Sequence, residues 1–306
     1  MPPDLQRGQA RPQEGYVSTA NAQLYVRTIG QGRPLLLLHG GPDFDHNYLL
    51  PDIDRLADLG RLITYDQRGR GRSAGNVRPE DVTLASEMAD LEALRQHFGL
   101  EAFALLGHSW GGLLALEYAL RHPARLSHLI LLNTAPASRA DYRLLRQSRL
   151  ESAAGDLGRQ AAIRDTPAYR AGDLAADAAY YHLHFRRTLR RPEHLEQVVN
   201  SLRVHFTPQT VLLARAIEER LMAETWLADG YDLLPRLQHL PVPTLVLHGE
   251  ADLIPPACAA HIASALPDAR LTVLQETGHF AYLEKPAIVH QEIAAFLDAP
   301  EAATRG

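Results

Sequence analysis

The stretch FALLGHSWGGLLALEYALRH, residues 103–122, decides the fold of this 306-residue chain. It begins with an apolar run typical of a buried strand, and from Trp110 onward its apolar residues have helical spacing. The join, GHSWG at 107–111, is a G-x-S-x-G pattern at a strand-to-helix turn. Such a strained turn lifts the Ser109 hydroxyl clear of the sheet, at the positive end of a helix dipole. We therefore expect Ser109 to act as a nucleophile, the alternative being a glycine-rich turn with an incidental serine.

Apolar strand-like runs alternate with helix-period segments on both sides of this turn. This pattern predicts an α/β fold with a mostly parallel central sheet flanked by helices. PLLLLHG at 34–40 is continuously apolar and ends in glycine, as expected of a strand buried on both faces. Residues 16–29 predict an antiparallel hairpin at one edge of the sheet. The remaining predicted strands are 61–66, 103–108, 126–134, 242–249 and 269–275, and the main predicted helices are 83–98, 110–122 and 286–297.

The alternation stops at residues 134–236, which are rich in Ala, Leu and Arg and contain no strand-like apolar run. A block of this length is too long to be a simple crossover connection between two strands. It predicts a helical cap, or lid, inserted into an α/β core made of residues 16–133 and 237–298. Residues 1–15 and 299–306 are polar, and we expect them to be a flexible arm and a flexible tail.

Composition and charge exclude several classes of protein. The chain carries 31 basic and 36 acidic residues, so it lacks the basic excess that nucleic-acid binding requires. No run approaches the roughly 20 apolar residues of a membrane span, and the first residues do not form a signal peptide, so we expect no membrane partner. Cys258 is the sole cysteine, which excludes an internal disulfide and is compatible with a cytoplasmic location. We expect no metal or organic cofactor, and the oligomeric state stays open.

A serine hydroxyl needs a base that an acid orients, and the chain offers both after strands that follow the cap. Asp252 comes just after the strand at 242–249, and His279 lies in a glycine-preceded loop after the last strand. The carboxyl ends of parallel strands meet at one edge of a sheet, so these side chains should gather near Ser109. Glu250, closer to the strand end, is the rival acid.

The transition state of acyl transfer also needs hydrogen-bond donors for its oxyanion. The backbone N–H of Trp110 directly follows the serine and is one candidate. The second should come from the loop His39-Gly40-Gly41-Pro42-Asp43, where glycines let the backbone approach a substrate closely. We choose Gly41, with Gly40 as the next choice, and a simple turn is the alternative interpretation.

Five motifs together resemble an α/β-hydrolase, and more narrowly the proline iminopeptidase group of serine peptidases. They are HGGPD at 39–43, YDQRGRGRS at 65–73, GHSWGG at 107–112, LVLHGEADLIPP at 245–256 and TGHFAYLEKP at 277–286. The resemblance implies a Ser109–His279–Asp252 triad with the Gly41 and Trp110 nitrogens as the oxyanion hole. Asp43 departs from the group, which usually has glycine there. The three arginines of the second motif are expected to brace loops through carboxylates.

An aminopeptidase must hold the free ammonium of its substrate, which calls for carboxylates in the cap. Glu218, Glu219 and Glu224 are the nearest candidates, although charged helix residues usually form a solvated face. We expect a serine hydrolase that releases N-terminal proline or another small residue from short peptides. The alternatives are a carboxylesterase or lactonase acting on small acyl esters and, more remotely, a non-catalytic ligand-binding protein of the same fold.

Overall fold

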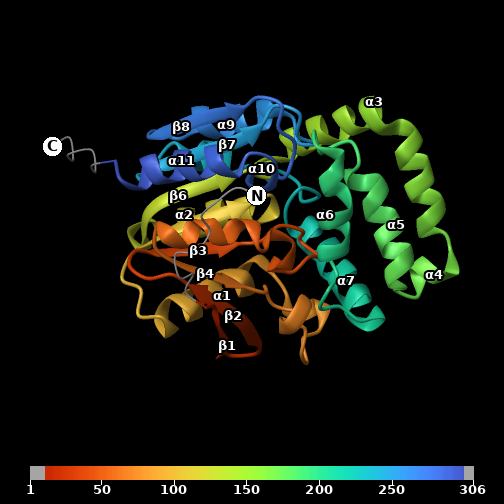
Figure 1. Cartoon of the computed structure of the whole chain (residues 1–306), viewed down its shortest axis with the longest axis horizontal. Coiled ribbons are helices and arrows are strands. Elements are labelled where there is room, and N and C mark those ends of the chain that lie inside the picture. The colour runs from red at the N-terminus through yellow and green to blue at the C-terminus, as the bar shows by residue number, and fades with distance from the viewer. Residues whose placement is uncertain (1–10, 300–306) are drawn as a thin grey trace, which may run out of the picture.

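The computed structural model describes residues 11–299 and contains one eight-stranded sheet in the order β1-β2-β4-β3-β5-β6-β7-β8 (Figure 1). The six strands from β3 to β8 are mutually parallel, and β2 joins them antiparallel to β4. All residues of β5 and β7 are buried, as continuous apolar runs at the centre of a parallel sheet require. The strands are β1 Gln13–Ser18, β2 Gln23–Ile29, β3 Pro34–Leu38, β4 Arg61–Tyr65, β5 Phe103–His108, β6 Leu126–Leu132, β7 Thr244–Gly249 and β8 Ala269–Leu274.

The antiparallel hairpin at the sheet edge starts earlier than the sequence predicts. Gln13, Glu14 and Gly15 belong to β1 and pair with β2, so the predicted flexible arm is wrong for these three residues. Their side chains are mostly exposed and polar, so the strand there depends on backbone pairing and leaves no apolar alternation in the sequence. Residues 1–10 of the arm and 300–306 of the tail lie outside the described residues.

Two apolar clusters cover the two faces of the sheet. Met88, Leu91 and Leu94 of α1 pack on one face together with α2 and α9. The other face packs against α11 and a 3₁₀ helix at Asp52–Asp58. The helices that flank the sheet or connect its strands are α1 Leu84–His97, α2 Trp110–Arg121, α9 Pro256–Ala265, α10 Ala281–Glu284 and α11 Pro286–Leu297. Shorter 3₁₀ turns lie at His46–Leu49, Gly71–Ser73, Pro79–Asp81, Pro123–Arg125 and Pro192–His194.

The chain between β6 and β7 is helical. Its helices gather beyond one end of the sheet, and α3 bends at Ala153, where the backbone is not helical (Figure 1). The block leaves and re-enters the core at one place, because Arg139 N–H donates to Tyr231 O at 2.9 Å and Leu233 N–H donates to Ala137 O at 3.0 Å. The helices are α3 Arg139–Arg164, α4 Pro167–Arg170, α5 Leu174–Phe185, α6 Leu195–Ser201, α7 Pro208–Glu224 and α8 Leu234–Leu237. Among residues 11–299, no helix combines the length and apolarity needed to cross a bilayer.

Candidate active site

Ser109 lies at the sharp turn between β5 and α2. Its backbone has φ 55° and ψ −120°, a strained conformation for a residue with a side chain. The turn closes tightly, since a Cβ on Gly107 would lie 2.3 Å from Gly111 O and one on Gly111 would lie 2.2 Å from Leu38 O. The Ser109 N–H donates to Leu132 O at 3.0 Å, which ties the turn to the neighbouring strand. Both glycines are therefore needed to hold the serine at the carboxyl end of the sheet.

Ser109, His279 and Asp252 form one hydrogen-bonded row. His279 Nε2 lies 3.0 Å from Ser109 Oγ, and His279 Nδ1 lies 2.8 Å from Asp252 Oδ1. Asp252 is fully buried and the His279 side chain is 6% exposed. Burial alone would raise the pKa of Asp252, but its interactions with His279 and His248 outweigh burial and lower that pKa. The structure thus keeps a charged acid, an imidazole and a hydroxyl in line.

The rival acid, Glu250, does not contact His279. Its side chain is exposed, and Glu250 Oε2 accepts a hydrogen bond from the Glu276 N–H at 3.1 Å. Of the two acids left open by the sequence, Asp252 is therefore the one that faces the imidazole, because it lies in the loop beyond the strand end.

Asn133 is a site residue that sequence reasoning missed. Its Nδ2 donates to Asp252 Oδ2 at 2.7 Å and to Gly278 O at 3.1 Å, so it joins the acid loop to the histidine loop. Its φ of 48° is one that asparagine tolerates better than most residues. The sequence could have indicated Asn133 through its position, because it is a polar residue directly after the apolar run of β6, at the carboxyl end of a parallel strand.

A chain of hydrogen bonds links the loop after β3 to the histidine loop. The Gly40 N–H donates to the Tyr48 hydroxyl at 2.7 Å, and that hydroxyl lies 2.7 Å from His108 Nδ1. His108 Nε2 donates to the carbonyl of His279 at 3.0 Å, so Nδ1 must accept from Tyr48. Burial lowers the pKa of His108 to about 3, which keeps it neutral and suits this arrangement.

The Gly40 N–H is thus already engaged, which favours Gly41 as the oxyanion donor. Within residues 11–299, no acceptor is assigned to the backbone N–H of Gly41 or of Trp110. Gly41 has φ 126°, in the region that favours glycine, and α2 begins at Trp110. The N–H groups of Gly41 and Trp110 therefore have no other acceptor among the described residues, so both are able to bind an oxyanion.

The prediction that the arginines of residues 65–73 brace loops is confirmed. Arg68 pairs with the buried Asp90 at 2.5 Å, and Arg70 pairs with the buried Glu87 at 2.5 Å. Arg70 Nε also donates to Pro42 O at 2.8 Å, so this ion pair supports the loop that follows Gly41.

The helical block contacts the same loop through a buried ion network around Arg203, which follows α6. Arg203 bonds Asp43 Oδ2 at 2.7 Å and also donates to the Asp43 carbonyl. On its other side Arg203 Nε donates to Asp177 Oδ2 at 2.8 Å. Tyr181 and Arg215 complete the network, on Asp43 and Asp177 respectively, each at 2.5 Å. Asp43, which stands where the resembling group usually has glycine, therefore links the helices between β6 and β7 to the loop after β3.

The three predicted cap glutamates lie in different environments. Glu218 is partly buried, and among the described residues its carboxylate has no hydrogen bond or ion pair. Burial raises the pKa of Glu218 to about 8, and the negative charge of Asp43 adds to this effect. Glu219 is exposed. Glu224 accepts a hydrogen bond from the Leu84 N–H at 2.8 Å and so stabilises the first turn of α1.

The bond to Leu84 gives no support to substrate binding by Glu224, and the exposed Glu219 has no feature that supports it, so both stay predictions. The sequence could not separate the three because their burial depends on how α7 packs on the core. His182 and His184 have different partners, since His182 lies 3.3 Å from Glu196 and His184 lies 3.3 Å from Arg149.

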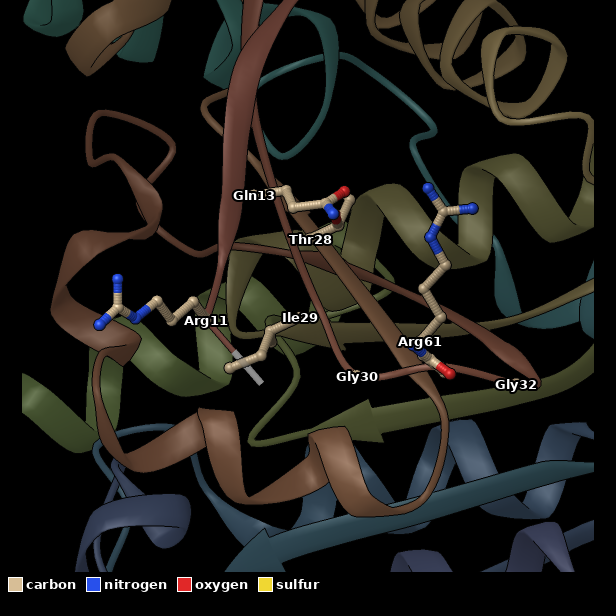
Figure 2. A pocket seen from close by; sticks show the side chains of 8 residues that line it. Arg11, Gln13, Thr28, Ile29, Gly30, Gly32 and Arg61 are labelled. Carbon is tan, nitrogen blue, oxygen red and sulfur yellow. The ribbon is translucent and has the colours of Figure 1, made fainter. Parts of the chain in front are cut away.

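A surface hollow of about 410 Å³ lies away from the predicted site residues, beside the end of β2 and the start of β4. Figure 2 shows the Arg11 and Arg61 side chains at this hollow extending to opposite sides. It lies at the amino ends of the parallel strands and is distant in the fold from Ser109.

Comparison with known proteins defines the class first. Residues 33–286 match the alpha/beta hydrolase fold family, and the chain belongs to this family. It is 33% identical to a proline iminopeptidase of Levilactobacillus brevis, over 95% of this chain and 98% of the relative. Proline iminopeptidase from Mycobacterium smegmatis is similar in structure, with a TM-score of 0.69 at 26% identity over 93% and 97% of the chains. A thermophilic esterase from Thermogutta terrifontis gives 0.68 at 27% identity over 93% and 98%.

Proposed function

We propose that this α/β hydrolase is a serine hydrolase that works through an acyl-enzyme on Ser109. The observation that carries the proposal is the row of hydrogen bonds at 3.0 Å and 2.8 Å from Ser109 Oγ through His279 to Asp252. His279 Nε2 accepts the hydroxyl proton as Ser109 Oγ attacks the substrate carbonyl. His279 then gives that proton to the leaving group as its bond to the acyl carbon breaks. A water molecule, activated by the same imidazole, releases the acyl group from Ser109.

The developing oxyanion is held by the backbone N–H groups of Gly41 and Trp110. Both are free of other acceptors among the described residues, whereas the Gly40 N–H is occupied by Tyr48. Loss of one such donor costs about 10²–10³ in kcat in serine hydrolases of this kind. The tie between Asp43 and Arg203 keeps the loop that carries Gly41 in place.

The substrate we propose is a short peptide from which N-terminal proline or another small residue is released. Two observations support it: the relatives named proline iminopeptidase, and the unpaired carboxylate of Glu218 in the cap. A partly buried carboxylate without a partner is suited to bind an ammonium group. Glu218 also lies close enough to Asp43, beside the oxyanion loop, for the two charges to interact.

A small-ester hydrolase is the second candidate function. It is favoured by the similarity to the thermophilic esterase, which is comparable in structure and identity to the similarity to the M. smegmatis peptidase. An ester substrate would use Ser109 and His279 in the same way and would not need Glu218.

Turnover of prolyl arylamide, compared with turnover of a short acyl ester of the same chromophore, tests whether the protein is a peptidase or an esterase. We expect amide turnover at rates near those of the ester, with both activities lost in Ser109→Ala. Fast ester turnover beside negligible amide turnover would exclude the peptidase and leave the esterase. Retention of either activity in Ser109→Ala would exclude the acyl-enzyme on this serine.

A further inference from the structure

A hollow of about 310 Å³ lies between cap helices α3 and α5 and the loop that carries Asp252. The two helices pack against each other (Figure 1). The titratable residues that line the hollow are Arg149, Asp156, His184, Arg187 and Asp252. It therefore adjoins the proposed catalytic acid on one side and is covered by the cap on the other.

One cation in this hollow has no counter-ion. Arg187 Nε bonds Asp156 Oδ2 at 2.6 Å, so these two charges are balanced. The carboxylate of Asp252 is engaged by His279 and Asn133. Arg149, by contrast, is partly buried and makes no ion pair within residues 11–299. Burial lowers the pKa of Arg149, opposed by Glu218 and two tyrosines nearby. A guanidinium that is desolvated without a carboxylate is costly unless a ligand supplies one.

The neighbour of Arg149 reinforces its preference for an anion. Arg149 NH2 lies 3.3 Å from His184 Nδ1, and a guanidinium can only donate, so Nδ1 is the acceptor. The imidazole proton is then on Nε2, and burial keeps the ring neutral by lowering the pKa of His184 well below its usual value. The pair thus offers N–H donors and no free acceptor to a ligand.

The donor pair is near the proposed catalytic histidine, because His184 lies close enough to His279 for their charges to interact. The Phe185 ring, next to His184, stacks on the His279 ring with centroids 6.5 Å apart. The Thr188 carbonyl accepts a hydrogen bond from the His279 N–H at 2.8 Å. Because His279 protonates the leaving group, that part of the substrate must extend along the His279 side of Ser109.

We propose that Arg149, assisted by His184, binds a free carboxylate on the leaving-group side of the substrate. Planar guanidinium groups bind carboxylates through two parallel hydrogen bonds, which suits a terminal carboxylate. Under the proposed aminopeptidase function, on which this inference rests, the site selects di- and tripeptides, whose C-terminal carboxylate is near the scissile bond. Glu218 and Arg149 together then match the two charged ends of a short zwitterionic peptide.

The test compares prolyl-leucine with prolyl-leucinamide, which differ in the carboxylate. We expect the wild-type kcat/KM to favour the free acid by about tenfold or more, the effect of about 1.4 kcal/mol. Arg149→Met should abolish this preference, mainly through KM, and leave amide turnover within about twofold. Arg146→Met, at an exposed arginine of the same helix, should leave the preference intact. Equal turnover of acid and amide by the wild type, or an equal loss of both in Arg149→Met, would overturn the proposal.

A parallel ester pair separates this proposal from the peptidase function. Acetoxyacetate carries a carboxylate on its leaving group, and acetoxyacetamide does not. If peptides are not cleaved but acetoxyacetate is preferred in an Arg149-dependent manner, the carboxylate site stands and the aminopeptidase function falls. If peptides are cleaved without any preference for the free acid, the aminopeptidase function stands and the carboxylate site falls.

Discussion

Replacement of Arg203 by methionine should destabilise the protein strongly. The Arg203 side chain is 7% exposed and lies between the carboxylates of Asp43 and Asp177, which are 2% and 0% exposed. Asp177 keeps the cation Arg215, whereas Asp43 keeps only the neutral Tyr181 hydroxyl, so the substitution leaves the buried Asp43 carboxylate without a cation among the described residues. Removal of one partner from a buried pair costs about 3–5 kcal/mol, because an uncompensated charge remains inside. We expect the free energy of unfolding to fall by that amount.

Urea unfolding followed by circular dichroism measures this change, provided that the slope with urea stays the same. Arg143→Met is the matched control, since Arg143 is exposed and makes no ion pair among the described residues. It should change the free energy of unfolding by less than about 0.5 kcal/mol. Adding Asp43→Asn to Arg203→Met should recover part of the loss, because the unpaired charge is removed. A loss below about 1 kcal/mol for Arg203→Met alone would refute the reasoning about this network.

Three further predictions concern the site. Burial raises the pKa of the Glu218 carboxyl to about 8, and the α-amino group of the substrate loses its proton at about the same pH. The ion pair needs the anionic carboxylate and the protonated amine together, so kcat/KM for prolyl arylamide should rise as the pH approaches about 8 and fall above it. The rise between about pH 7 and 8 should be absent in Glu218→Gln assayed over the same range. Glu224→Gln should leave KM for the same substrate within about twofold, because Glu224 bonds the first turn of α1; a tenfold increase in KM would return it to the substrate site. Asn133→Gly keeps the positive φ and removes the amide that bonds Asp252. A hydrogen bond to a charged group is worth about 1.5–3 kcal/mol, so steady-state kinetics should show kcat lower by about tenfold or more. An unchanged kcat would count against a positioning role for Asn133.

The sheet could be predicted from sequence because buried parallel strands are continuous apolar runs that end at punctuating glycines and turns. The turn that carries Ser109 could also be predicted, because the G-x-S-x-G pattern between a strand-like run and a helical run is contained in a short stretch of sequence. Parallel strands bring the loops at their carboxyl ends to one edge of the sheet, so Ser109, Asp252 and His279 could be grouped from the sequence alone.

Contacts between distant segments were not predictable. Asp43 and Arg203 are 160 positions apart and belong to different layers, and nothing in either local sequence indicates the other. The environments of Glu218 and Glu224 likewise depend on which distant segments α7 packs against, and its local sequence does not indicate them. Strand β1 began early for a related reason: backbone pairing at a sheet edge needs no apolar side chains.

Reaction with a fluorophosphonate probe, followed by mass spectrometry of the labelled peptide, tests most directly whether Ser109 is an activated nucleophile. We predict one label per chain on the peptide that contains Ser109, none in Ser109→Ala, and labelling slowed by about 10²-fold or more in His279→Ala, because the imidazole 3.0 Å away is the base. Labelling at another residue, or wild-type rates in His279→Ala, would contradict the account of this site.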